Sequence, residues 1–93
     1  MFPVGKVRQD FAAKERVLGI EMNQTSKAYP LKALARRTGY VNDMIGGAAI
    51  KIEVNAEGEI VSVRDDSGNP VAHIFAYWFA WQAFHPQTEV YSD

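Results

Sequence analysis

The sequence predicts an α+β domain in which a small, mostly antiparallel sheet or partial barrel packs against one aromatic-rich helix, with one further short helix. Three observations predict this fold. Two stretches alternate apolar and polar residues, as strands with one wet face do. A short one-sided apolar stripe follows Pro30, and an aromatic run at residues 74–84 has no polar face. The chain of 93 residues is long enough for one core and too short for two.

The first residues are expected to form an extended arm. Residues 1–15 mix proline, glycine and scattered charge with few apolar anchors, a composition that does not favour a regular element. We therefore expect an arm over residues 1–15 and a single α+β domain over residues 16–93.

The next elements are a hairpin and a short helix. The mostly apolar run at residues 17–22 is followed by polar residues 23–26 and then by Lys27-Ala28-Tyr29, which predicts a β-hairpin with a loop of three or four residues. Pro30 suits the start of a helix, and the apolar stripe that follows ends before Gly39. The expected helix has about two turns.

A second hairpin is predicted downstream. Residues 48–54 alternate isoleucine and valine with lysine and glutamate, and residues 59–64 repeat this alternation after the turn Asn55–Gly58. Two such runs joined by a short turn are typical of an antiparallel hairpin. A second turn at Asp65–Pro70 leads to a short extended piece at Val71-Ala72.

The aromatic run is predicted to be a helix that is apolar on all sides. It spans Ile74–Phe84, and His85-Pro86 ends it. At about 100° per residue, its aromatic rings cluster on one side and its alanines form a smooth strip opposite. Thr88–Tyr91 could add an edge strand.

Composition excludes several classes of protein. A net charge of −1 provides no basic field for nucleic acid. The longest apolar run, Ile74–Trp81, is too short to span a bilayer, and the first twenty residues hold no signal-peptide core. The chain has no cysteine, so cysteine usage leaves the compartment open.

No metal or cofactor is expected. His73 and His85 lie at opposite ends of the predicted helix, too far apart to bind one ion if that helix is continuous. The sequence also lacks a P-loop, a nucleophile-elbow motif and a zinc-protease motif.

The most suggestive polar group is Asn42-Asp43 followed by Gly46-Gly47. Paired glycines allow a backbone to approach a ligand closely. A glycine-assisted turn into the next strand explains the same residues and is the favoured interpretation.

Three stretches together resemble a known family. They are KERVLGI from Lys14, AYPLKAL from Ala28 with Val41-Asn42-Asp43 and Gly46-Gly47, and YWFAW from Tyr77 with Phe84-His85-Pro86 and Thr88–Tyr91. The chain resembles, over residues 2–91, the carboxyl-terminal part of bacterial and archaeal proteins of domain of unknown function 3179. The resemblance implies that longer relatives carry an upstream copy with a Cys-Pro-x-Cys segment, often behind an export signal or lipid anchor. It supplies no activity that can be carried over to these residues.

Two functions from different classes follow. The favoured one is a non-catalytic interaction module that docks on a second copy of itself or on the missing half of a longer protein. The alternative is a small-ligand or enzymatic site. Its candidate catalytic residues are Asn42, Asp43 and His85, and its candidate ligand-binding residues are Tyr29, Gly46 and Gly47. The predicted partner interface of the favoured function consists of Phe2, Phe11, Trp78 and Trp81.

Overall fold

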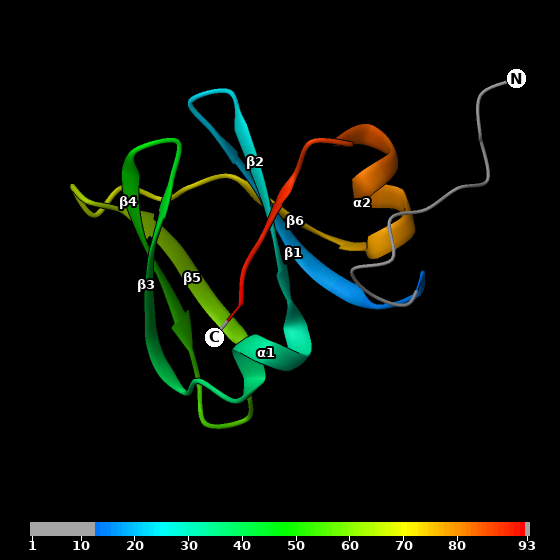
Figure 1. Cartoon of the computed structure of the whole chain (residues 1–93). Helices are drawn as coiled ribbons and strands as arrows, with labels where there is room; N and C mark the ends of the chain where they lie inside the picture. Colours follow the sequence, from blue (N-terminus) through cyan, green and yellow to red (C-terminus); the bar gives the residue numbers. More distant parts are fainter. Residues whose placement is uncertain (1–12, 93) are drawn as a thin grey trace, which may run out of the picture.

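The computed structural model describes residues 13–92. Its elements in chain order are β1 (Arg16–Met22), β2 (Thr25–Pro30), α1 (Leu31–Ala35), β3 (Gly39–Ile45), β4 (Ala48–Val54), β5 (Ile60–Asp65), β6 (His73–Tyr77), α2 (Trp78–Phe84) and β7 (Glu89–Val90) (Figure 1). Most of the predicted arm lies outside the described residues.

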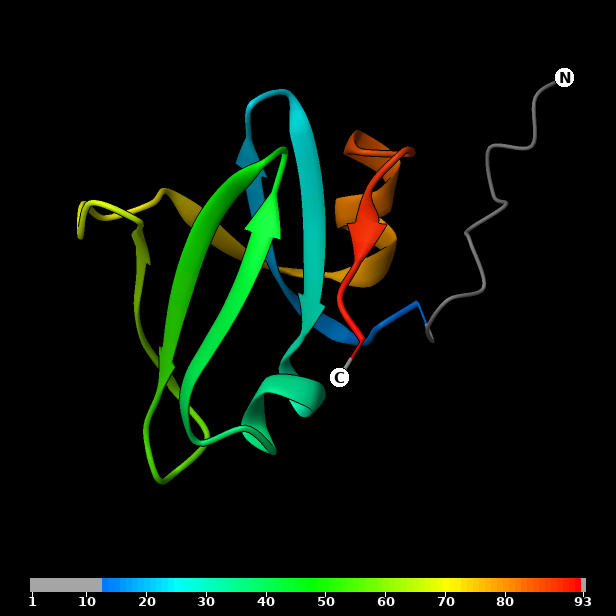
Figure 2. The same cartoon turned by 60° about the vertical axis from the view of Figure 1, so that its left-hand side comes forward.

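The strands form two sheets. The first is four-stranded with the order β6-β1-β2-β7, antiparallel except for the β2–β7 pair, and the second is three-stranded with the order β3-β4-β5. The fold is therefore mixed α+β with mostly antiparallel strands, as predicted, but it has two sheets instead of one, and they do not close into a barrel. Figures 1 and 2 show the second sheet on one side of the first, and α2 on the other side.

The main core lies between the two sheets. Leu18, Ile20 and Tyr29 contribute from the first sheet. The second sheet contributes the inward-facing residues of each strand, which are Val41, Ile45, Ile50, Ile52, Val54 and Val63. Alternation at β4 explains this placement, because Ile50, Ile52 and Val54 are buried while Lys51 faces solvent.

A smaller cluster lies on the opposite face of the first sheet. It contains Val17 and Ala28 from the strands and Trp78 and Trp81 from α2. The indole of Trp81 lies directly over Gly19, where an added Cβ would come within 2.3 Å of the ring. A glycine at this position of β1 lets the ring lie flat against the backbone.

Both predicted hairpins are confirmed. The turn of the first is shorter than the predicted loop of three or four residues: it has two residues, Asn23 and Gln24, with φ of 52° and 64°, as a type I′ turn requires. The second pairs β4 with β5, with a bulge at Glu53 and Val54. The predicted helix after Pro30 is present but shorter, five residues long. Strand β3 has no counterpart among the predicted elements, and the suggested edge strand near the end is the two-residue β7.

The prediction of one helix over Ile74–Phe84 is wrong in its first half. Residues 73–77 form strand β6, which pairs antiparallel with β1, and α2 begins only at Trp78. Aromatic and β-branched residues fit a pleated surface well. Pairing with β1 satisfies the backbone N–H and C=O groups of β6, and this pairing cannot be predicted from the local sequence because β1 is far away along the chain. In the described residues, no helix is long and apolar enough to cross a membrane.

Candidate functional site

Three polar side chains meet where the two sheets face each other. The hydroxyl of Tyr29 donates to Oδ2 of Asp43 at 2.7 Å, and Nζ of Lys27 lies 2.7 Å from the same oxygen. Lys27 and Tyr29 are two residues apart on β2, so both side chains point to the face that meets β3. The cluster therefore joins the first sheet to the second.

The cluster is largely shielded from water. Tyr29 is fully buried, and the side chains of Lys27 and Asp43 are 14% and 21% exposed. Burial, followed by the hydrogen bond and charge of Asp43, raises the pKa of Tyr29 well above its usual value. Burial alone would also raise the pKa of Asp43, but hydrogen bonds from Lys27 and Tyr29 outweigh it and lower that pKa.

The pKa directions of Tyr29 and Asp43 do not favour acid–base chemistry at this cluster near neutral pH. A tyrosine with a raised pKa keeps its proton near neutral pH, and an aspartate with a lowered pKa stays ionised and cannot donate a proton. The ring of Tyr29 also packs against Tyr91, with centroids 5.2 Å apart, and the Tyr91 hydroxyl accepts from Arg37 at 3.1 Å. Each polar group is thus held by other residues of the chain.

The other two candidate residues of the predicted site lie elsewhere. Asn42 points to the outer face of the second sheet and lines a hollow of about 250 Å³ with Lys51 and Arg64. His85 lies against Trp81, with ring centroids 4.0 Å apart, and lines a different hollow of about 300 Å³. Of Tyr29, Asn42, Asp43 and His85, only Tyr29 and Asp43 come together.

The glycine pair forms the β3–β4 turn. Gly46 has φ of 56° and Gly47 has φ of 84°, values that glycine adopts most readily. A Cβ on Gly46 would lie 2.8 Å from the carbonyl oxygen of Met22, and the Asn23 side chain donates to the Gly46 carbonyl oxygen at 3.0 Å. The close approach that the pair permits is to the neighbouring β1–β2 turn.

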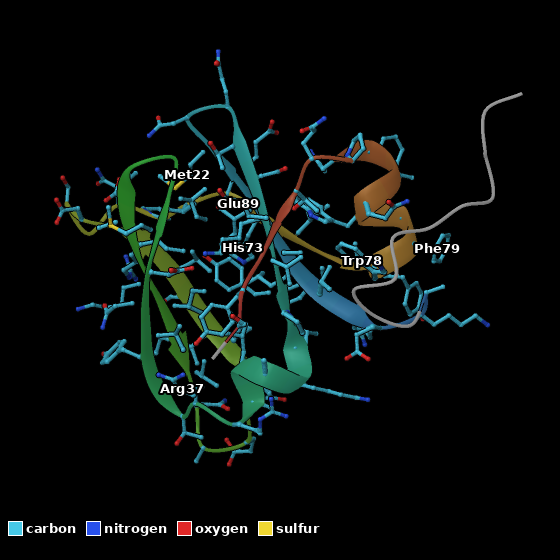
Figure 3. All side chains as sticks on the ribbon, viewed as in Figure 1. Met22, Arg37, His73, Trp78, Phe79 and Glu89 are labelled. Carbon is cyan, nitrogen blue, oxygen red and sulfur yellow. The ribbon has the colours of Figure 1, made fainter. Side chains whose placement is uncertain are left out.

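The predicted interface needs a correction at the two tryptophans. Trp78 is fully buried and Trp81 is 4% exposed, so both rings belong to the core of this chain. Figure 3 shows Trp78 between α2 and the sheet, and Phe79 on the outer side of the helix. The other two predicted interface residues, Phe2 and Phe11, lie outside the described residues.

Other apolar side chains of the same segment face solvent. We call them the β6–α2 rim, and each is at least 44% exposed: Ile74, Phe75, Tyr77, Phe79 and Phe84. The rings of Tyr77 and Phe79 stack with centroids 6.1 Å apart. Strand β6 thus presents large apolar side chains to solvent on both of its faces.

Sequence reasoning missed two residues. Lys27 could have been found, since a lysine at an inward position of a strand, two residues from a buried tyrosine, signals a buried ion pair. Thr88 is 3% exposed, and its hydroxyl accepts from the indole N–H of Trp81 at 2.9 Å. No local pattern marks that contact, because it depends on how the chain returns after α2.

The described residues contain no group of three or more metal-ligating side chains that could hold an ion. His73 and His85 both line the hollow beside Trp81, because residues 73–77 form a strand and the two histidines are not at opposite ends of one helix. Their rings nevertheless lie on different faces of the first sheet. The ring of His73 contacts Phe75, on the face toward the second sheet, whereas His85 packs on Trp81.

Comparison with known proteins gives one result. A family described as a protein of unknown function, DUF3179, matches residues 1–88. The chain belongs to this family. The predicted resemblance is thereby confirmed, while the placement at the carboxyl end of longer members stays a prediction. No curated protein and no solved structure matches the chain significantly.

Proposed function

We propose that this DUF3179 domain is a non-catalytic interaction module that forms a homodimer through its β6–α2 rim. The observation that carries the proposal is the combination of exposure and composition in one segment. Residues 71–88 hold no Asp, Glu, Lys or Arg, and five of their large apolar side chains are at least 44% exposed. Clustered apolar exposure is typical of surfaces that another protein covers.

The structure supports an interaction role over the alternative site because the polar candidates are separated. Tyr29 and Asp43 satisfy each other in a cluster of low exposure, while Asn42 and His85 line two different hollows. A catalytic site requires its groups within reach of one substrate atom. The four residues do not meet that requirement, so the alternative finds less support.

A second copy is the occupant that the charges favour. The chain carries a net charge of −1, so two copies repel each other weakly. A rim without charged side chains can face its own copy without bringing like charges together. Two-fold dimers are also the commonest oligomers.

Light scattering over a range of concentrations tests the proposal. The wild-type chain of 10.4 kDa is expected to approach twice that mass as its concentration rises. Phe79→Lys places a charge in the rim and should keep the protein monomeric. The matched control is Met44→Lys, because Met44 is 54% exposed but lies on β3, and it should dimerise like the wild type.

A wild type that stays monomeric at high concentration would overturn the homodimer. If Phe79→Lys dimerises as readily as Met44→Lys, the rim is not the dimer contact. The double variant Phe2→Ser and Phe11→Ser measures the contribution of the predicted arm. If this variant is fully monomeric, the arm and not the rim forms the interface.

A further inference from the structure

The backbone of β6 has one paired edge and one unpaired edge in the described part of the chain. β6 is the end strand of the order β6-β1-β2-β7, and its only ladder partner among the described strands is β1. The amide N–H of Trp78 donates to the carbonyl oxygen of Glu15 at 2.7 Å, which continues the β1–β6 register by one residue.

That hydrogen bond fixes which backbone groups face outward. Bonded and non-bonded pairs alternate along an antiparallel ladder, so Ala76 and Ile74 bond to Val17 and Gly19. The backbone groups of His73, Phe75 and Tyr77 then point away from β1. Together they form an open row of donors and acceptors that another strand could pair with.

The other edge strands of the described fold carry protection that β6 lacks. β7 is only two residues long, and β3 carries the charge of Asp43. Residues 69–71 cover part of β5, with the amide of Val71 donating to the Val63 carbonyl oxygen at 2.9 Å. β6 contains no proline, no charged residue and no bulge among its five residues. Edges of this kind pair with other strands.

We propose that β6 pairs antiparallel with β6 of a second copy, with the two-fold axis at Phe75, joining the two four-stranded sheets into one continuous sheet. This inference rests on the proposed homodimer and specifies its geometry. The outward-facing residues must pair with each other, and centring on Phe75 is the choice that uses all five residues of the strand. His73 then lies opposite Tyr77 of the second copy, and Phe75 lies opposite its own copy.

The side chains fit this register. No charged residue is brought opposite its copy, because β6 has none. Phe75 borders a hollow of about 500 Å³ that Leu31 and Ile60 also line, together with the oppositely charged Arg16 and Glu59, and this hollow gives room for the Phe75 ring of the second copy. Such an interface is smaller than that of most permanent dimers, so we expect association to depend on concentration.

Disulfide trapping tests the register, because the native chain has no cysteine. A bonded antiparallel pair places its Cα atoms about 5.5 Å apart, within the range that a disulfide spans. Under mild oxidation, Phe75→Cys should therefore form covalent dimers. Tyr77→Cys alone should form few, but mixed with His73→Cys it should form heterodimers readily. Val61→Cys, at an equally exposed position on β5, is the control and should stay monomeric.

The outcomes separate this inference from the proposed function. If light scattering reports a dimer but Tyr77→Cys or Val61→Cys cross-links as fast as Phe75→Cys, the register is wrong and the homodimer survives. If wild type and all variants are monomeric, both proposals fail. Thermal melts of each reduced variant test whether the fold is intact. If Phe75→Cys does not fold, the mixture of His73→Cys and Tyr77→Cys tests the register instead.

Discussion

The β4–β5 hairpin and the β6–α2 segment are both rich in apolar residues, but they differ in how many of these side chains are exposed to solvent. In the hairpin, Ile52 and Val63 point into the core while Lys51 and Arg64 face water. In the β6–α2 segment, buried tryptophans alternate with exposed phenylalanines and no charged residue intervenes. Apart from Val61, the hairpin buries its large apolar side chains, whereas the segment exposes five of them, and these form the surface of the proposed dimer.

The same difference explains where sequence reasoning succeeded. The alternation over β4 is compatible with one structure only, a strand with one buried face, and together with the turn Asn55–Gly58 it predicts the hairpin. The β6–α2 segment has no charged residue and too few polar residues to mark a face, so its period cannot be determined, and the sequence predicts one helix where a strand is followed by a helix. Substitutions in the two regions should separate their roles.

The largest expected effect is at Trp78. Trp78→Ala should lower the free energy of unfolding by about 3–5 kcal/mol, because it removes a fully buried ring from the cluster beneath α2. The neighbouring Phe79→Ala should cost under about 1 kcal/mol, since Phe79 is 44% exposed. Urea melts at low protein concentration measure both. Similar costs would contradict the division between core and rim.

The next effect is at Gly19. Gly19→Ala should cost about 1–3 kcal/mol, because its Cβ would overlap the ring of Trp81 at 2.3 Å. In a double-mutant cycle, Trp81→Leu should relieve most of the added cost of Gly19→Ala. If the free-energy costs of Gly19→Ala and Trp81→Leu are additive, the Trp81 ring does not pack on Gly19.

The cluster joining the sheets predicts a dependence on acid. The pKa of Asp43 is lowered in the folded state, so its contribution to stability is complete above the usual value of about 4 and is lost as the pH falls through the folded value. Asp43→Asn should cost roughly 1–3 kcal/mol at neutral pH, because it leaves Lys27 without its charged partner.

The measurement is a series of urea melts between neutral and acid pH. The wild type should lose stability more steeply below about pH 4 than Asp43→Asn does. The control Asp66→Asn alters an exposed turn residue and should follow the wild type. A slope that Asp43→Asn leaves unchanged would refute the assignment of acid sensitivity to this cluster.

The smallest effect is expected on the outer face of the second sheet. Met44→Lys should change the free energy of unfolding by less than about 0.5 kcal/mol, because the side chain is 54% exposed. A large cost would mean that this face, and not the rim alone, is covered in the assembled protein.

The candidate site was harder to predict than the fold. Alternation and turn residues predict the hairpins, and Pro30 with the apolar stripe after it predicts the short helix. The proximity of Tyr29 and Asp43 depends on how two sheets pack, which no local pattern encodes, and the partner of both, Lys27, was missed. The sequence predicts Trp78 and Trp81 at an interface because the predicted helix is apolar on all sides, whereas the strand–helix break lets both indoles pack against β1 and β2.

Amide hydrogen exchange of β6, followed by NMR at low and high protein concentration, tests the central claim most directly. At low concentration, the amides of Ile74 and Ala76 should exchange slowly, since they bond to β1, and those of Phe75 and Tyr77 should exchange fast. At high concentration, we predict that Phe75 and Tyr77 become protected while Ile74 and Ala76 stay protected. Exchange at Phe75 and Tyr77 that is fast at every concentration would contradict the account.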